Sequence, residues 1–261
     1  MSFTPEIEKQ RGKWKQDLLA LKEPIKTKTI TNESSLEIAD LLFKHFTQNG
    51  LQPDTAILNA HLQLCETLEQ SSRVIEHYRL YGVWYNTATI NLLISKASDF
   101  NTSIRFLNKI RELRLKPTKY TFYRLFGKAE TLEDGYNLMD KMNENGIVPD
   151  LITYNNLLGL CSDSTQRNKV FGAMTEDGIN PNNITYNTII SHSAGFPEAL
   201  DTYFQFIERL PPDFKTLISL LKKAETIADL NRVERLFSDS GLIPDGTWIT
   251  ALKRIREKFK E

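Results

Sequence analysis

The sequence predicts an all-α protein, an α-solenoid of stacked helix-turn-helix repeats that wind into a right-handed superhelix. Glycine and proline recur together at intervals of about 32 residues, and the apolar residues between them follow the spacing of one helix face. Signals for β-strands are essentially absent. Because two short antiparallel helices cannot bury their apolar faces alone, neighbouring repeats must stack around one continuous core.

The end of each repeat is marked by a helix-stop signal. Gly50, Gly82, Gly146 and Gly178 lie on a 32-residue grid, and Arg114 occupies the one intermediate position. Six of the ten prolines fall at the same repeat ends: Pro53, Pro117, Pro149, Pro181, Pro212 and Pro244. Glycine readily adopts the left-handed conformation that ends a helix, and a proline shortly after it prevents the helix from continuing.

Cutting the chain after these turns gives a repeat array over residues 34–245. It comprises a partial repeat at 34–54 and six repeats at 55–86, 87–118, 119–150, 151–182, 183–213 and 214–245. In each repeat the fourth, seventh, eighth and eleventh residues are mostly apolar, which predicts that an amphipathic first helix opens the repeat. A second helix follows a polar break, as at Glu133–Asn145 and Thr165–Asp177, and Thr131–Asp134 resembles a capping box.

The two ends of the chain are predicted to close the array. Residues 1–33 supply a capping helix around Pro5–Leu21 and a linker, and Ser34–Asn49 forms the second helix of the partial repeat. Residues 246–261 supply a C-terminal capping helix. Its apolar face carries Trp248, Ile249, Leu252, Ile255 and Phe259, and its basic face carries Lys253, Arg254, Arg256, Lys258 and Lys260. A repeat array needs such caps for solubility.

The composition argues against several classes of protein. Thirty-three Lys and Arg balance thirty-three Asp and Glu, and residues 27–245 carry a net charge of −5, which is unlike a strong non-specific binder of polyanions. No apolar run reaches the roughly 18 residues of a membrane span. Cys65 and Cys161 fall in a column of small packing residues, so we expect no metal site. Phosphate-loop and nucleophile motifs are missing, so we expect neither a cofactor nor an enzymatic activity.

Two segments carry a resemblance to a known family. They are Leu151-Ile-Thr-Tyr-Asn-Asn-Leu-Leu-Gly-Leu-Cys161 and Asn183-Ile-Thr-Tyr-Asn-Thr-Ile-Ile190, each preceded by a Gly-x-x-Pro-Asp or Gly-x-x-Pro-Asn turn. These residues closely resemble the pentatricopeptide repeat family. The Trp, Leu-Gly and Tyr spacing of the tetratricopeptide repeat is missing. The resemblance implies binding of single-stranded RNA, at roughly one base per repeat.

The fifth residue of the repeat is the main candidate for base recognition. It lies three positions after the second residue, so both occupy one face of the first helix, offset from the core. Four repeats carry asparagine at this position, namely Asn59, Asn91, Asn155 and Asn187, while Tyr123 and Ile218 occupy the other two. An amide offers a donor and an acceptor to a base edge. The alternative is that these asparagines cap helices or bridge neighbouring repeats by hydrogen bonds.

The resemblance implies that the fifth residue acts together with the last residue of its repeat. The pairs are Asn59 with Asn86, Asn91 with Thr118, Asn155 with Asn182, Asn187 with Asp213, Tyr123 with Asp150, and Ile218 with Asp245. Asn with Asp is similar to a uracil reader, Asn with Asn to a pyrimidine reader that favours cytosine, and Asn with Thr to a weaker pyrimidine reader. The last two pairs depart from the pattern and receive no base. From the 5′ end, the predicted order is pyrimidine, pyrimidine, unassigned, pyrimidine, uracil, unassigned.

Two further sets of residues are candidate RNA contacts. In the family manner, the second residues would wedge between bases: Ala56, Ala88, Tyr120, Ile152 and Ile184, with Lys215 breaking the column. Lys96, Lys128 and Lys223 are each tenth in their repeat and could meet phosphates, or they are solvated surface lysines. The basic face of the C-terminal helix has the same two interpretations.

The sequence therefore predicts a pyrimidine-preferring RNA-binding adaptor that acts in RNA processing, stability or translation by occupancy or recruitment. The alternative is a protein-interaction solenoid, a subunit of a ribosome or other ribonucleoprotein, with proteins of that complex as partners. No membrane partner is expected. The resemblance suggests mitochondria or plastids, and because the chain shows no transit peptide, a cytoplasmic setting stays open.

Overall fold

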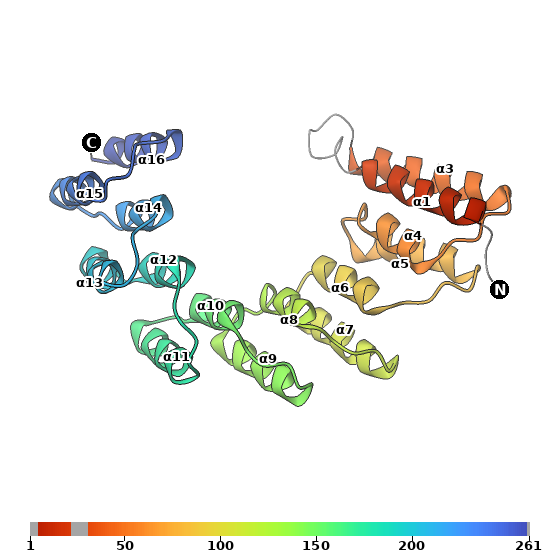
Figure 1. Ribbon diagram of the computed structural model, residues 1–261, viewed down its shortest axis with the longest axis horizontal. Helices are drawn as coiled ribbons and strands as arrows, with labels where there is room; N and C mark the ends of the chain where they lie inside the picture. Colours follow the sequence, from red (N-terminus) through yellow and green to blue (C-terminus); the bar gives the residue numbers. More distant parts are fainter. Residues whose placement is uncertain (1–4, 22–30, 260–261) are drawn as a thin grey trace. The chain divides into compact units, whose positions relative to one another are not determined.

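The computed structural model describes residues 5–21 and 31–259, and every regular element within those ranges is an α-helix (Figure 1). The predicted all-helical repeat fold is thereby confirmed. The chain divides into two compact parts, one up to Lys128 and one from Ala129. Among the described helices, none is long and apolar enough to cross a membrane. The right-handed winding of the whole array stays a prediction.

The N-terminal part is built from helix pairs in which each first helix packs on the next. Its helices are α1 (Pro5–Ala20), α3 (Asn32–Gln48), α4 (Thr55–Leu62), α5 (Leu68–Arg79), α6 (Thr87–Lys96), α7 (Phe100–Glu112) and α8 (Lys119–Phe126). α4 packs on α6 and α6 on α8, and α1 packs on α4 in the same way. The predicted N-terminal cap is thus the first helix of a further pair, and its Trp14 and Leu18 are completely buried.

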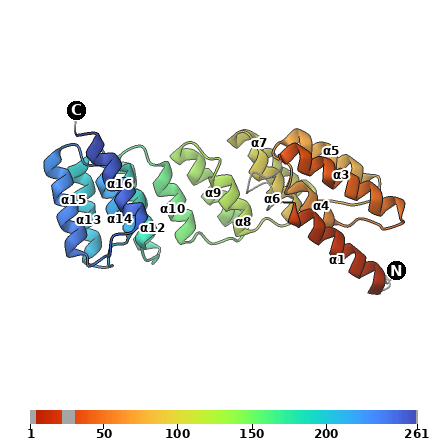
Figure 2. The same ribbon diagram turned by 90° about the horizontal axis from the view of Figure 1, so that it is seen from above.

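The C-terminal part repeats this arrangement. Its helices are α9 (Leu132–Glu144), α10 (Leu151–Leu160), α11 (Ser164–Glu176), α12 (Asn183–His192), α13 (Phe196–Ile207), α14 (Phe214–Lys222), α15 (Ile227–Asp239) and α16 (Gly246–Glu257). The first helices α10, α12, α14 and α16 contact one another in chain order, and each of α10, α12 and α14 also contacts its own second helix (Figure 2). The first helices therefore share one continuous face.

The predicted apolar columns form the core. In α10 the fourth, seventh and eighth residues, Tyr154, Leu157 and Leu158, are at most 2% exposed. The same columns are buried in α4, α6 and α14. The sequence prediction missed one further column, the third residue, where threonine recurs and is completely buried: Thr89, Thr121, Thr153, Thr185 and Thr216.

The repeat-end turns take the predicted left-handed conformation. Gly146 has a φ of +69°, and the N–H of the next residue, Ile147, returns to the carbonyl of Met142 at 2.9 Å. Arg114 takes the same conformation with a φ of +53°, although a side chain disfavours it. The helix that precedes the Gly146 turn begins with the predicted capping box, because Thr131 and Asp134 exchange hydrogen bonds of 3.1 Å.

Two predicted details at the ends are wrong. α3 begins at Asn32 rather than at Ser34, because Thr31 serves as its cap and accepts a hydrogen bond from the Ser34 N–H. In α16, Ile249 is 57% exposed and does not share the buried face of Trp248 and Ile255. It lies about 100° around the helix from Trp248, and no described helix follows α16 to cover it.

Candidate nucleic-acid interface

The last residue of each repeat caps the first helix of the next. Asn182 caps α12, where its Oδ1 accepts a 3.0 Å hydrogen bond from the Thr185 N–H. Asp213 caps α14 in the same way, with a 2.7 Å bond from the Thr216 N–H. The same role falls to Asn86, Thr118, Asp150 and Asp245. One side-chain oxygen of the last residue of each of these repeats is therefore committed to a helix terminus.

The structure brings two of the predicted pairs into contact. In the N-terminal part, Asn59 Nδ2 donates to Asn86 Oδ1 at 3.3 Å, and the Thr89 hydroxyl donates to Asn59 Oδ1 at 2.7 Å. In the C-terminal part, Asn187 Nδ2 donates to Asp213 Oδ1 at 3.4 Å. Asn59 thus bridges to Thr89 of the next repeat, and Asn187 binds the residue that caps the next first helix, α14. Hydrogen bonds of this kind are the alternative that the sequence left open.

The fifth-position amides are less exposed than the sequence predicts. Asn91 is only 7% exposed, and Asn59, Asn155 and Asn187 are half-buried, because adjacent first helices pack closely on either side. The Oδ1 atoms of Asn91, Asn155 and Asn187 are buried and find no hydrogen-bond partner in the described part of the chain. Such acceptors are rare in folded proteins, and they mark a place where a donor is missing.

Exposed apolar side chains lie beside these amides. The second-position residues Tyr120, Ile152 and Ile184 are 50%, 49% and 60% exposed, and Ala56 and Ala88 are exposed as well. In α10 and α12 each isoleucine stands one helical turn before the amide of the same helix. An exposed apolar side chain thus lies next to an amide on each of these helices. This arrangement suits a nucleobase, which has apolar faces and polar edges.

Comparison with known families finds a match in the middle of the chain. The pentatricopeptide repeat domain matches residues 125–164 and 137–195. Residues 125–195 are thus similar to the pentatricopeptide repeat domain. These residues include both segments on which the resemblance rests, so the resemblance is confirmed there. No curated protein matches the sequence as a relative.

Solved structures extend the similarity in fold. The maize pentatricopeptide repeat protein PPR10 has a TM-score of 0.53 and 20% identity to this chain, and the similarity covers 84% of this chain and 34% of PPR10. PPR10 in complex with an 18-nucleotide psaJ RNA element has a TM-score of 0.50 and 19% identity, over 92% of this chain and 40% of PPR10. This chain therefore spans less than half the length of these structures, and at such identity the likeness concerns the fold.

The surroundings of the capping residue Asp213 determine its protonation state. Partial burial acts to raise the pKa of Asp213, but hydrogen bonds from the Thr216 N–H and hydroxyl and from Asn187 outweigh it and lower the pKa overall. Asp213 is therefore ionised at neutral pH, and its free oxygen can only accept a hydrogen bond. The last two repeat ends that carry a fifth-position asparagine thus present caps of two kinds, the Asp213 carboxylate and the Asn182 amide.

Two of the predicted phosphate-binding lysines have partners within the protein. Lys96 Nζ donates to the backbone carbonyl of Cys65, and Lys223 Nζ donates to that of Ser193 at 2.7 Å. In both cases the tenth residue of one repeat binds the carbonyl of the eleventh residue of the preceding repeat. These lysines satisfy carbonyls at the end of the neighbouring first helix. Lys128 is half-buried, and phosphate contact by all three stays a prediction.

Substitution of Lys223 tests this structural role. Lys223→Met keeps the aliphatic stem but leaves the Ser193 carbonyl without its donor, so we expect a loss of about 1 kcal/mol in the free energy of unfolding. The adjacent exposed Lys222→Met serves as the control and should leave stability unchanged. Urea denaturation measures both, and equal stability of the two variants would contradict the inter-repeat role of Lys223.

The basic residues of α16 lie on two different sides of the helix. Arg256 forms a forked ion pair with Glu234 at 2.7 to 3.1 Å, and Lys253 lies on the same side as Arg256. Arg254 and Lys258 instead face a separate hollow. Lys260 lies outside the described residues.

The two cysteines lie in the interior of the protein. Cys65 and Cys161 are free and buried, and burial raises the pKa of the Cys161 thiol to about 11. In the described part of the chain, no group of three or more His, Cys, Asp or Glu could hold a metal ion.

Proposed function

We propose that this chain binds single-stranded RNA and reads pyrimidine bases with the fifth-position amides and the capping residues of its repeats. The observation that carries this proposal concerns the repeats that end at Asn182 and Asp213. One oxygen of each of these side chains is committed to a helix terminus, and the fifth-position amides of the same repeats, Asn155 and Asn187, each have an unmet acceptor. The similar fold of PPR10, which is described in complex with an RNA element, supports it.

The capping geometry gives a physical reason for base preference. Because Oδ1 of Asn182 accepts from Thr185, the group left for a ligand is the Nδ2 amine, which only donates. Because Oδ1 of Asp213 accepts from Thr216, the group left is Oδ2, which only accepts. Cytosine presents an acceptor at N3, whereas uracil presents an N–H donor there. Asn182 therefore suits cytosine, and Asp213 suits uracil.

The same reasoning separates the other repeats. The single hydroxyl oxygen of Thr118 already accepts a hydrogen bond as the cap of α8. Because Thr118 has no second side-chain oxygen or nitrogen to offer a base, its pair with Asn91 is a weaker reader. Asn86 is also a cap, but its partner Asn59 is already occupied by Thr89. We therefore expect the pairs Asn155 with Asn182 and Asn187 with Asp213 to contribute most to base selection.

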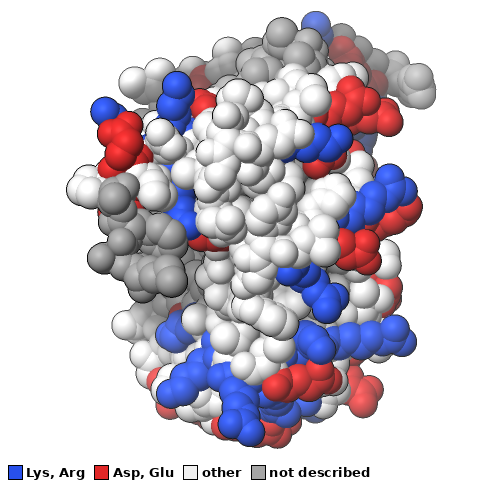
Figure 3. Space-filling view, turned by 90° about the vertical axis from the view of Figure 1, so that its right-hand side faces the viewer, with Lys and Arg blue, Asp and Glu red and all other residues white. Residues whose placement is uncertain are grey.

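The exposed apolar side chains of the first helices favour single strands over duplexes. Side chains such as Ile152 and Ile184 can contact a base only if it is unstacked from its neighbours, and a duplex hides both faces of its bases. On the side of the molecule where α1 and α3 lie, charges of both signs surround an uncharged band, and no continuous basic stripe is visible (Figure 3).

In this proposal the protein acts without chemistry of its own. A bound strand is sheltered from nucleases or held open for other factors, so that processing, stability or translation of the transcript changes. Binding is of modest affinity, because the net charge of zero gives little non-specific attraction to phosphates.

Removal of two amides tests the proposal. Asn155→Ala with Asn187→Ala should weaken binding of a pyrimidine strand by about fivefold for each amide, since a neutral hydrogen bond contributes roughly 1 kcal/mol. Binding of a purine strand of equal length should not change. Fluorescence anisotropy with labelled RNAs at low and moderate salt measures both. The matched control is Asn168→Ala with Asn231→Ala, two exposed asparagines on second helices.

The outcome also separates the two candidate functions. Equal losses in the test and control variants would contradict base reading by the fifth column. If the unaltered protein binds neither strand even at low salt, the RNA proposal fails. The fold would then serve as a protein-interaction solenoid, a subunit of a ribosome or other ribonucleoprotein, and partner proteins would be sought.

A further inference from the structure

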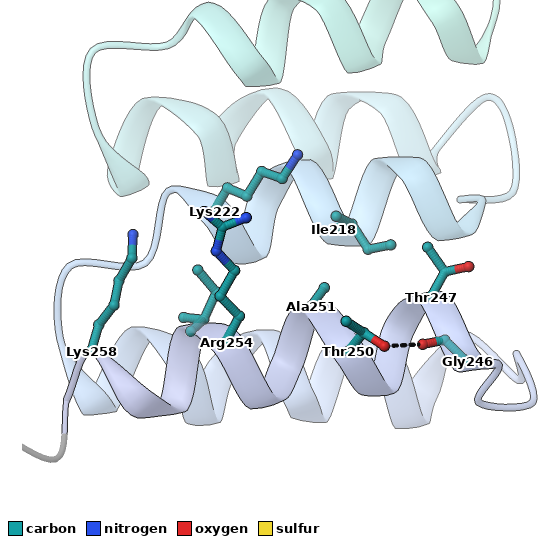
Figure 4. A pocket seen from close by; sticks show the side chains of 9 residues that line it. Ile218, Lys222, Gly246, Thr247, Thr250, Ala251, Arg254 and Lys258 are labelled. Atoms are coloured by element: carbon teal, nitrogen blue, oxygen red, sulfur yellow. Dashed lines mark hydrogen bonds between the residues drawn. The ribbon is translucent and has the colours of Figure 1, made fainter. Parts of the chain in front are cut away.

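A hollow of about 720 Å³ lies between the last two first helices, α14 and α16. Ile218 and Lys222 line it from α14, and α16 contributes residues of one face, among them Ala251, Arg254 and Lys258 (Figure 4). Ile218 is the fifth residue of its repeat, so the hollow opens on the face that we propose for RNA. It is a continuation of that interface at the C-terminal end.

Three cations line the hollow without a carboxylate among the lining residues. Lys222 and Arg254 are each ninth in register on neighbouring first helices. In Figure 4 the Arg254 side chain reaches from α16 toward α14, the Lys222 amine points away from α16, and Lys258 rises from the next turn of α16. None of these three side chains forms a hydrogen bond or ion pair in the described part of the chain. By contrast, the adjacent Lys223 and Arg256 both have protein partners. Unpaired like charges that line one hollow attract an anion.

The floor of the hollow cannot read a base. Ile218 replaces the asparagine of the other repeats and offers no hydrogen bond, and the Thr250 hydroxyl donates to the Gly246 carbonyl within α16. Ile218 and Ala251 instead give an apolar floor beneath the cations. The site therefore combines a non-selective apolar surface with positive charge, the two features that bind a nucleotide through its base face and its phosphate.

We propose that this hollow holds a backbone phosphate of the bound RNA strand through Lys222, Arg254 and Lys258, and fixes the strand there without selecting its base. This inference rests on the proposed RNA-binding function. It gives an anchoring role to the repeat at 214–245, which lacks a base-reading pair. Along the described first helices of the C-terminal part, we find no other cluster of unpaired cations. This cluster lies at the end of the face that we propose for base reading.

The test uses the full chain with Arg254→Gln and Lys258→Gln, which remove two charges and keep the polar, extended side chains. The control is Lys253→Gln with Arg235→Gln, which removes the same charge from exposed positions outside the hollow. Anisotropy titrations at several salt concentrations give the slope of log K against log salt for a pyrimidine strand. The loss of this one phosphate contact should reduce the slope by about 0.7.

A second measurement separates anchoring from base reading. In the hollow variant, the ratio of affinities for pyrimidine and purine strands should equal that of the unaltered protein, because the reading pairs are intact. The inference is overturned if the hollow variant and the control have the same salt slope while the unaltered protein binds RNA. If the unaltered protein binds no RNA, the proposed function itself fails, and the two failures are thus distinguishable.

The source of the phosphate is resolved by the same titrations. Strands with a 5′-phosphate, a 3′-phosphate or hydroxyls at both ends are compared on the unaltered protein and the hollow variant. A defect on all three strands assigns the hollow to an internal phosphodiester. A defect confined to one end-phosphorylated strand assigns it to that terminal phosphate. Either result supports the inference.

Discussion

Asp213→Asn is expected to change the base preferred by the repeat at 183–213 from uracil to cytosine. Asparagine caps helices as well as aspartate does, so α14 should keep its cap from Thr216. The group left for the base, however, changes from an acceptor oxygen to a donor amine. A well-formed pair of hydrogen bonds to a base discriminates by about 1 to 3 kcal/mol, or roughly 5- to 150-fold.

The control for this exchange is Asp245→Asn. Asp245 caps α16 in the same manner, but the fifth residue of its repeat is Ile218, which offers no amide. This variant should leave the base preference unchanged. Anisotropy competition between strands that differ only by uracil or cytosine at one position measures both variants. An unchanged preference in Asp213→Asn, with binding retained, would contradict the assignment of the cap as a base reader.

Glu198→Ala is expected to cause the largest loss of stability. Arg167 is only 3% exposed, and its Nη2 donates to Glu198 at 3.0 Å, linking α11 to α13. Removal of the carboxylate leaves a buried guanidinium without its counter-charge, and breaking such a pair costs about 3 kcal/mol. The double variant Arg167→Met with Glu198→Ala removes the unpaired charge and should recover most of that loss.

An exposed pair in the same part of the chain provides the comparison. Arg256 also pairs with a glutamate, Glu234, but it is 52% exposed, so Glu234→Ala should cost less than about 1 kcal/mol. Urea denaturation followed by circular dichroism measures each variant. Equal losses in Glu198→Ala and Glu234→Ala would show that burial of Arg167 does not govern stability here.

The buried ion pair between Arg167 and Glu198 makes the stability of the protein depend on pH. Burial acts to raise the pKa of Glu198, but hydrogen bonds from the Ala194 N–H and from Arg167 outweigh it and lower the pKa below its usual range. A group with a lowered pKa contributes its full stability above the pKa of the unfolded chain and loses it as pH falls through the folded value. The difference in stability between the unaltered protein and Glu198→Ala should therefore shrink in acid.

The parts of the fold that depend on local pattern could be predicted from the sequence. The buried columns of α10 follow from apolar residues at helical spacing, and the turn at Gly146 follows from the conformational preferences of glycine and proline. The positions of the capping residues at repeat ends follow from the same turns. All of these signals lie within a few residues of one another.

The features that the sequence did not reveal depend on residues about 30 positions apart. Nothing in the sequence around Lys223 indicates that its amine binds the Ser193 carbonyl of the preceding repeat, because a solvated lysine has the same local pattern. Arg167 similarly finds Glu198 across a repeat boundary. The burial of Asn91 depends on how closely α6 packs on its neighbours, which periodicity alone does not specify.

Photocrosslinking tests the central claim, that RNA lies on the face of the first helices, most directly. A pyrimidine strand with 4-thiouridine in place of uridine is irradiated with the protein, and mass spectrometry locates the crosslinked peptides. The proposal predicts crosslinks in α10 and α12, around Ile152, Ile184 and Asn187. Crosslinks confined to the second helices α11, α13 and α15 would contradict it.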